Sequence, residues 1–377
     1  MAETVFLYNP ELERHRWPPE CPFRPERARR ARQIAAKMGL LASAQVAELV
    51  PPAAGRDELE RFHTPEYLQV LGRADAGEFA EEWLEMGLGR DDTPVFAGML
   101  AHSALACGAS LQGAKLLLEG RARAVFNPAG GFHHARAGRA AGFCFLNDLV
   151  LACLLLADAG RRVAYIDIDA HHGDGVQEAF YDDPRVLTVS LHESGRTLYP
   201  GTGFSDEIGA GAGRGYCVNL PLPAGTHNQA YLRAFEQGCL PLLDAFAPEF
   251  IVLQAGMDAL HGDPLAHLSL TNGAQARVVR LLLERERPLL MTGGGGYDVE
   301  ATARGWTRAW AVLAGLEEEE DASIGLGGVL LESAEHLAGL QDRQIETPAD
   351  VRRAVDNQVD QLLADLRRQL FARHGLE

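Results

Sequence analysis

The sequence carries little positive charge for its length. Its 377 residues include 35 Lys and Arg against 52 Asp and Glu, which gives a formal net charge of −17. Because basic surfaces hold nucleic-acid phosphates, this balance argues against a protein that binds DNA or RNA. A cationic partner, such as a lysine-rich segment or a polyamine, would be attracted instead.

Long hydrophobic runs are also absent. No stretch of eighteen apolar residues occurs, and the first residues contain no basic segment followed by an apolar one. We therefore expect no membrane association and a cytoplasmic location.

Cysteine is scarce and scattered. No C-x-x-C pair occurs, which argues against a zinc ribbon. Most cysteines lie in apolar or helical segments, so we expect them to be buried and reduced. They are Cys21, Cys107, Cys144, Cys153, Cys217 and Cys239.

Short apolar runs alternate with helical stretches between residues 95 and 315, and 47% of all residues are hydrophobic. This alternation predicts an α/β fold in which helices flank a parallel β-sheet. We expect a single domain over residues 1–377, with its core at about 20–315. Helices are expected at residues 96–118, 146–156, 229–246, 274–286 and 301–313.

A long amphipathic helix is expected near the C-terminus, over about residues 347–373. Thr347-Pro-Ala-Asp350 has the form of a capping box with proline in the first turn. We expect its apolar stripe to pack on the protein's own core rather than on another subunit. The stripe consists of Val351, Val355, Val359, Leu362, Leu363, Leu366 and Leu370.

The most informative segment is Asp167-Ile-Asp-Ala-His-His-Gly-Asp174, which directly follows the apolar run 162–166. Open α/β sheets bind their ligands at strand ends, and carboxylates with imidazoles suit a divalent transition metal. Asp169 and His171 are two residues apart, so their side chains are expected to leave the same side of the chain. An ordinary polar turn is the alternative interpretation, but four Asp and His in the eight residues from 167 to 174 make it less favoured.

Three more strand ends carry polar or glycine-rich segments. Ala124-Val-Phe126 leads to His133-His134, and the apolar segment 250–258 ends in Asp258. Asp258 is therefore the natural third metal ligand. The run 288–292 leads into Gly293-Gly-Gly-Gly-Tyr297, where glycines permit close backbone approach and Tyr297 stands over the site. No Lys-Ser/Thr pair follows these glycines, which argues against a phosphate loop.

Several motifs together resemble the zinc-dependent histone deacetylase family. Within that family, Gly87-Leu-Gly-Arg-Asp-Asp-Thr-Pro94 and the segment 192–200 are most similar to bacterial acetoin-utilisation deacetylases. The resemblance implies the arginase/deacetylase-like fold. The shared motifs are Gly130-Gly-Phe-His-His134, Gly142-Phe-Cys-Phe-Leu-Asn-Asp148, Asp167 to Gly175, Tyr199-Pro-Gly-Thr-Gly203, Gly262-Asp-Pro264 and Gly293 to Tyr297.

The resemblance also implies how an amide would be hydrolysed. Asp169, His171 and Asp258 would hold one catalytic metal that activates a water. Zinc is expected first, but two carboxylates with one imidazole would also accept Fe(II) or Co(II).

The remaining catalytic groups also follow from the resemblance. His134, oriented by Asp174, would be the general base, and His133, oriented by Asp167, an electrostatic element or later acid. The Tyr297 hydroxyl would stabilise the oxyanion.

Substrate contacts are assigned by the same resemblance. Phe143 and Tyr199 would be walls of the acyl-lysine channel, with Gly142 beside them and Leu265 in the following loop. Asp92 would grip the substrate backbone at the rim, with Asp91 as its competitor. Arg27 would line a pocket below the metal, although its motif opens with Cys21-Pro22 where the family usually has His-Pro.

Relatives also hold a potassium ion near the catalytic metal. The matching positions here are Asp167 and Ser190, with the carbonyls of Asp169, His171 and Leu191. A potassium ion is therefore expected as a second cofactor.

The substrate and two other functional classes remain open at this point. Acetylated lysine in proteins, such as an acyl-CoA synthetase, is the first expectation, and acetylpolyamines or other small acetamides are the alternative. A two-metal ureohydrolase is disfavoured because Gly173 occupies the place of a further acid. A non-catalytic acyl-lysine-binding module is disfavoured because every catalytic residue type is present. The sequence leaves the oligomeric state open.

Overall fold

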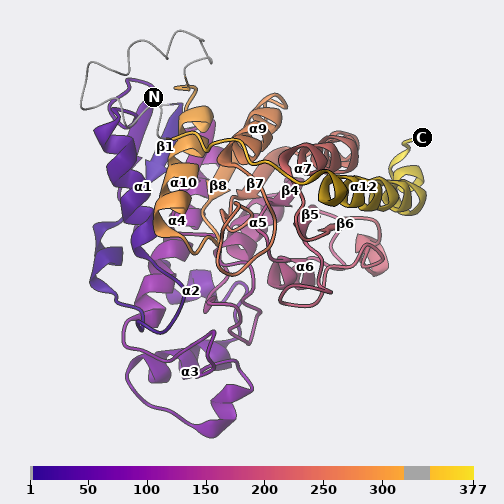
Figure 1. The fold of residues 1–377 in the computed structure, drawn as a ribbon. Helices are drawn as coiled ribbons and strands as arrows, with labels where there is room; N and C mark the ends of the chain where they lie inside the picture. The colour runs from indigo at the N-terminus through magenta and orange to yellow at the C-terminus, as the bar shows by residue number, and fades with distance from the viewer. Residues whose placement is uncertain (1–2, 318–339) are drawn as a thin grey trace.

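A computed structural model describes residues 3–317 and 340–377. The described residues contain one sheet of eight parallel strands, in the order β2-β1-β3-β8-β7-β4-β5-β6, with helices on both faces (Figure 1). This confirms the expected α/β class with its parallel sheet. The strands are β1 (Thr4–Leu7), β2 (Val46–Leu49), β3 (Ala124–Asn127), β4 (Val163–Asp167), β5 (Val186–Glu193), β6 (Cys217–Leu222), β7 (Phe250–Gln254) and β8 (Leu289–Thr292).

One strand prediction needs correction. The segment 250–258 is not strand throughout, because β7 ends at Gln254 and Asp258 lies four residues further on, in the loop. β1 lies before the expected core of about 20–315 and pairs with β3 inside the sheet. The sequence reasoning did not identify β1, β2, β5 or β6 as strands.

The predicted helices are present, with shifted ends. Asn147 caps α5 by accepting from the Val150 amide, so this helix starts later than predicted. The stretch 229–246 is interrupted by a π-helical turn, η4 (Phe235–Cys239). The α-helices are α1 (Glu26–Lys37), α2 (Arg56–Leu59), α3 (Pro65–Asp75), α4 (Met99–Leu118), α5 (Asp148–Asp158), α6 (Asp174–Ala179), α7 (Asn228–Ala234), α8 (Leu240–Phe246), α9 (Asn272–Leu283), α10 (Val299–Leu313) and α12 (Ala349–Leu370).

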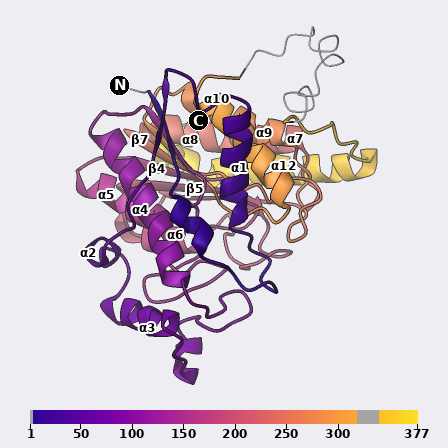
Figure 2. The same ribbon diagram turned by 90° about the vertical axis from the view of Figure 1, so that its left-hand side faces the viewer.

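Alternate residues of each strand face opposite helix layers, as the period of two requires. In β4, Val163 and Tyr165 belong to the buried cluster that includes residues of α4, α5 and α6, whereas Ala164 and Ile166 belong to the one that includes residues of α1, α9, α10 and α12. Figure 2 shows α4 and α5 on one side of the strands and α1, α9 and α10 on the other. Because both faces are covered, the central strands are wholly buried.

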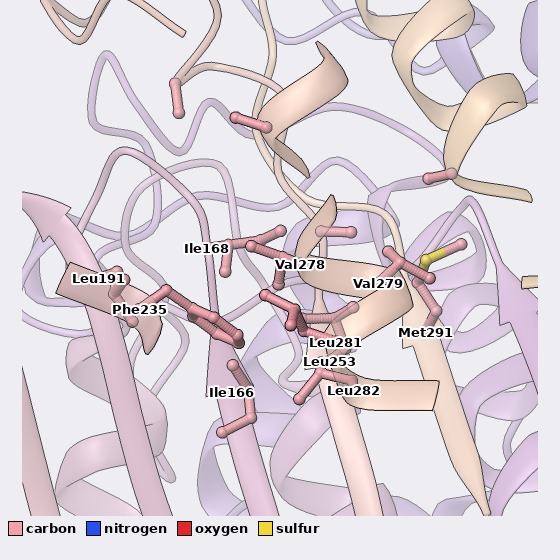
Figure 3. Packing of buried hydrophobic residues seen from close by; sticks show 14 of the residues in the cluster. Ile166, Ile168, Leu191, Phe235, Leu253, Val278, Val279, Leu281, Leu282 and Met291 are labelled. Atoms are coloured by element: carbon pink, nitrogen blue, oxygen red, sulfur yellow. The ribbon is translucent and has the colours of Figure 1, made fainter. Parts of the chain in front are cut away.

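The core on the α9 side is built from aliphatic side chains of several strands. In Figure 3, Val278, Val279 and Leu282 of α9 lie over Ile166, Leu253 and Met291 of β4, β7 and β8. All of these side chains are at most 1% exposed. The strands that carry the site are therefore closely packed against α9 on this face of the sheet.

The C-terminal helix packs on the protein's own core, as expected, but it begins differently. Thr347 lies outside the helix, and Pro348 occupies the capping position without a side-chain cap, so the capping-box prediction was wrong. Val351 is exposed, while the other six stripe residues are buried against α7, η4 and β6.

Two expectations drawn from absences were also tested. All six cysteines are buried free thiols. Within residues 3–317 and 340–377, every helix is too short or too polar to cross a membrane.

Candidate metal centre and active site

The four strand ends predicted from the sequence come together at one edge of the sheet. β3, β8, β7 and β4 are consecutive neighbours, and all run in the same direction. Their carboxyl ends therefore open onto one place. The loops that follow these strands carry the tandem histidines, the Asp-rich segment, Asp258 and the glycine run.

Asp169, His171 and Asp258 form a compact buried cluster. One ligand atom from each lies within 4.8 Å of the others, and it is the only such group found in the part of the chain that the structure describes. His171 Nδ1 is 3.2 Å from Asp169 Oδ1 and 3.0 Å from Asp258 Oδ2. Gly295 makes this possible, because a Cβ there would lie 1.9 Å from the Asp258 carboxylate.

The chemistry of this cluster suits a cation. Two ionised carboxylates in a buried position are costly without a positive partner. Burial opposes a proton on His171, yet its hydrogen bonds to Asp169 and Asp258 raise its pKa to about 10. Burial and the charge of Asp169 raise the pKa of Asp258 to about 7. Positive charge is therefore favoured between these side chains, and a divalent metal would supply it.

Further donors hold the carboxylates in place. Asp169 Oδ2 accepts from Gln254 Nε2 at 2.6 Å and from the Gly295 amide at 2.7 Å. Asp258 Oδ1 accepts from the Ala170 amide at 2.7 Å. Such outer contacts orient ligand oxygens. The sequence reasoning did not identify Gln254, which ends an apolar strand and gave no signal beyond its polarity.

The tandem histidines each donate to a separate carboxylate. His133 Nδ1 is 2.8 Å from Asp167 Oδ2, and His134 Nδ1 is 2.7 Å from Asp174 Oδ1. The two Nε2 atoms lie 3.0 Å apart, so no more than one of them can carry a proton toward the other. The structure thus forms both pairs that the sequence predicted.

The electrostatic surroundings separate the two imidazoles. Burial disfavours charge on His133, but Asp167 and Asp169 outweigh it and raise its pKa to about 9. Burial and the positive charge of His133 lower the pKa of His134 to about 4. His134 is therefore the neutral member of the pair at pH 7 and can accept a proton.

Tyr297 is placed by contacts on both sides of its peptide. Its amide donates to Asp263 Oδ2 at 2.8 Å, and the Arg27 guanidinium donates to the Gly296 carbonyl. The ring centroids of Tyr297 and His171 are 6.3 Å apart. Burial and the charge of Asp258 raise the pKa of the hydroxyl well above its usual value, so it remains a hydrogen-bond donor.

Phe143 projects from a strained turn. Gly142 and Phe143 both have positive φ, of 51° and 63°, between two hydrogen bonds that join Ala141 and Cys144. Two positive φ values mark a type I′ turn, and a non-glycine residue there costs about 1–3 kcal/mol. The ring centroids of Phe143 and Tyr297 are 5.7 Å apart, so the strain places an aromatic wall opposite Tyr297.

The two rim candidates, Asp92 and Asp91, differ in their contacts. Asp92 Oδ2 accepts from the Gly142 amide at 2.8 Å, whereas Asp91 is exposed. Tyr199 is 46% exposed, and its ring centroid is 5.2 Å from that of His134. Leu265 is half-buried in the loop after Asp263.

A narrow cavity of about 20 Å³ lies beside this cluster, and of the three cluster residues Asp169 lines it. Asp92, Tyr199 and Leu265 lie outside its lining. The lining residues are Phe23, Gly130, Gly131, Phe132, His133, His134, Gly142, Phe143, Cys144, Asp169, Gly294, Gly295 and Tyr297.

Arg27 lies in a larger cavity of about 660 Å³, which shares Phe23 and Gly130 with the narrow one. Its guanidinium carbon is 4.6 Å from the centroid of the Phe23 ring and 5.2 Å from that of Trp306. Arg27 thus lines a separate cavity, which shares two wall residues with the narrow one.

The predicted potassium positions are adjacent. Asp167 of β4 and Ser190 of β5 are directly paired in the sheet. The Ser190 hydroxyl contacts His192 Nδ1 at 2.8 Å, a partner that the sequence reasoning did not name.

Two polar partners near the histidines were also missed. Tyr165 donates its hydroxyl to Asp167, and Arg136 Nη2 donates to Asp174 Oδ2 at 3.1 Å. Tyr165 could have been found, because it precedes Asp167 by two residues on the same strand. Arg136 gave no such signal.

Comparison with known proteins is consistent with this site. The Histone deacetylase domain profile matches residues 21–313. The acetoin utilization protein AcuC of Bacillus subtilis is 38% identical over 325 residues, covering 84% of this chain and 84% of the relative. Histone deacetylase 8 of Xenopus tropicalis is 39% identical over 293 residues, covering 77% of this chain and 79% of the relative.

Two solved structures share the fold. A crystal structure of a histone deacetylase homologue complexed with SAHA superimposes with a TM-score of 0.85 at 31% identity, covering 97% of this chain and all of that one. The homologue from Aquifex aeolicus gives a TM-score of 0.83 at 31% identity, covering 96% of this chain and all of that one. The chain belongs to the histone deacetylase family of hydrolases.

Proposed function

We propose that the protein is a zinc-dependent lysine deacetylase that removes acetyl or other acyl groups from the ε-amine of lysine in proteins and releases acetate. The observation that carries this proposal is the convergence of three features on one narrow cavity. These are the buried Asp-His-Asp cluster, the two histidine–carboxylate pairs and the tyrosine hydroxyl. Apolar walls such as Phe143 suit a neutral acylated alkyl chain.

In this mechanism Asp169, His171 and Asp258 hold the metal. Zinc is the first candidate, and Fe(II) or Co(II) would also fit two carboxylates and one imidazole. When bound, such an ion polarises a carbonyl and lowers the pKa of a water molecule.

The chain's own groups perform the remaining steps. His134 Nε2 accepts the proton of the attacking water, because its Nδ1 is engaged by Asp174. The Tyr297 hydroxyl donates to the carbonyl oxygen as negative charge develops there. A histidine of the pair then protonates the leaving amine.

Two further features belong to this proposal. A potassium ion would be held by Asp167 and Ser190 with the carbonyls of Asp169, His171 and Leu191. We also propose that residues 1–377 form one deacetylase domain that works in the cytoplasm, with proteins such as an acyl-CoA synthetase as substrates.

A second substrate class is supported by one observation. The net charge of −17 attracts cations, which favours acetylpolyamines as well as lysine-rich peptides. A two-metal ureohydrolase is less consistent, because Gly173 packs against Asp167 where that class needs an acid, and the described residues offer one ligand cluster.

A substrate panel tests the proposal. Acetyl-lysine peptides, longer acyl-lysine peptides and acetylpolyamines would be compared by kcat/KM with the zinc-loaded protein. The highest value is expected for an acyl-lysine peptide. A higher value for an acetylpolyamine would move the substrate assignment to small amines, and no turnover of any amide would refute the enzyme assignment.

A further inference from the structure

The two histidine–carboxylate pairs are held by different kinds of donor. Asp167 is fully buried, and only buried groups donate to it: the Tyr165 hydroxyl, the Asp169 amide and His133. Asp174 uses one oxygen for His134 and the other for a cation, Arg136. Only the second pair therefore depends on a charged side chain that reaches the surface.

Both the side chain and the backbone of Arg136 are held by polar contacts. Its guanidinium contacts Asp174 Oδ2 at 3.1 Å through Nη2 and Glu178 Oε2 at 2.6 Å through Nη1. The two acids are four residues apart and therefore lie on the same face of α6. At the backbone, the Arg136 amide donates to the Arg139 carbonyl at 2.8 Å, which fixes the turn that follows His134.

We propose that Arg136 is a positioning residue of the deacetylation reaction, which holds Asp174 so that His134 keeps Nδ1–H on the carboxylate and presents Nε2 to the reacting groups. This inference rests on the proposed function. A carboxylate with a single partner can rotate about its terminal bond, whereas a guanidinium on the second oxygen stops that rotation. The tautomer and ring orientation of His134 would then depend on the contact between Arg136 and Asp174, which does not involve the reacting atoms.

The burial of Asp174 explains why its ion pair with Arg136 should affect the reaction. Exposed ion pairs contribute little, and the Arg136 side chain is 35% exposed. The Asp174 side chain, in contrast, is only 7% exposed, so loss of Arg136 would leave one carboxylate oxygen with little water to replace the guanidinium.

The test compares Arg136→Ala, Arg136→Lys and Glu178→Gln with the zinc-loaded wild type on one acyl-lysine peptide. Arg136→Ala should lower kcat about tenfold with KM changed less than twofold, which is the lower end of the roughly 10- to 100-fold cost of losing a comparable contact behind a metal ligand. Lysine should recover part of the loss, and Glu178→Gln should cost less than Arg136→Ala. Arg139→Ala is the matched control, because among the described residues its exposed side chain has no ion-pair or hydrogen-bond partner. It should leave kcat unchanged.

A double-mutant cycle with Asp174→Asn separates positioning from other roles. If Arg136 acts through Asp174, Arg136→Ala should lower kcat less than twofold in the Asp174→Asn background. Guanidinium ion should also restore part of the activity of Arg136→Ala, compared with sodium at equal ionic strength. If Arg136 only stabilised the fold, the Asp174→Asn background would not reduce the effect of Arg136→Ala, and guanidinium ion would restore no activity.

Two results would overturn the inference: an unchanged kcat in Arg136→Ala, or a full tenfold loss repeated in Asp174→Asn. If the alanine variant does not fold or loses zinc, the lysine and Glu178→Gln variants decide, and wild-type kcat in both would refute the role. An inactive wild type across the substrate panel would instead refute the proposed function.

Discussion

At the scale of single residues, the site places the same side-chain type in two opposite electrostatic environments. His133 and His134 are neighbours in sequence and 3.0 Å apart at Nε2, yet burial and local charge drive their pKa values in opposite directions. Asp167 and Asp169 surround His133, whereas His134 faces the positive charge of His133. This asymmetry supports His134 as the group that accepts a proton at neutral pH.

Replacing His134 by Ala should therefore lower kcat by about 10² or more, the usual scale of general acid–base catalysis. The metal should stay bound, because His134 is not one of the three ligands. Asp174→Asn should change kcat in the same direction by a smaller factor. Steady-state kinetics with metal analysis would check this, and near-normal turnover in His134→Ala would show that the base is another group.

Tyr297→Phe should lower kcat by about 10² to 10³, because an oxyanion donor acts mainly on charge that exists in the transition state. KM should move much less, and thermal unfolding should be almost unchanged, since only one oxygen is removed. A raised KM with unchanged kcat would show that Tyr297 is only a wall of the cavity.

At the scale of elements, four buried strands were predicted, although β1 and β5 are buried along their whole length and were missed. β3, β4, β7 and β8 are buried on both faces and read as apolar runs, so the strand ends could be located from the sequence. β2 is a half-exposed edge strand of four residues and lacks such a run. Pro241 explains the break within 229–246: proline cannot donate to residue 237, and the Leu240 amide instead bonds to Phe235 five residues back.

The type I′ turn at Gly142 offers a test at this scale. A Cβ at Gly142 would lie 2.3 Å from the His134 ring in a backbone conformation that disfavours side chains. Gly142→Ala should push the ring aside and lower kcat by up to about 10², the effect of a misplacement of about 1 Å. The substitution keeps the Gly142 amide that donates to Asp92, so this hydrogen bond serves as an internal control.

Gly138→Ala is the matched variant in the same loop. A Cβ there would meet nothing closer than Thr64 Oγ1 at 3.8 Å, and φ is not positive. Its kcat should equal that of the wild type. Equal losses in both variants would indicate that the loop as a whole, and not the turn geometry, is sensitive.

The C-terminal helix provides a stability test. Leu366 is fully buried against the body of the protein, so Leu366→Ala should lower the free energy of unfolding by about 2–5 kcal/mol. Val351→Ala, at the exposed start of α12, should change it by less than about 0.5 kcal/mol. Chemical denaturation would measure both, and a neutral Leu366→Ala would mean that α12 is not part of the cooperative core.

At the scale of the whole molecule, parallel topology explains how much of the site could be predicted. His133, Asp169, Asp258 and Tyr297 are far apart in sequence, but each follows a strand, and parallel neighbours end at the same edge. Strand-end position therefore predicted which residues meet. The contacts of Gln254, Tyr165 and Arg136 could not be predicted in the same way, because they depend on side-chain direction within the assembled loops.

The most direct test of the account combines metal content with acetate release from an acetyl-lysine peptide. The protein would be stripped with a chelator and titrated with Zn²⁺. The account predicts that activity is lost on stripping and returns in proportion to zinc, reaching its maximum at one ion per chain held by Asp169, His171 and Asp258. Acetate release that survives stripping, that needs a second tightly bound ion, or that is absent from the fully loaded protein would contradict it.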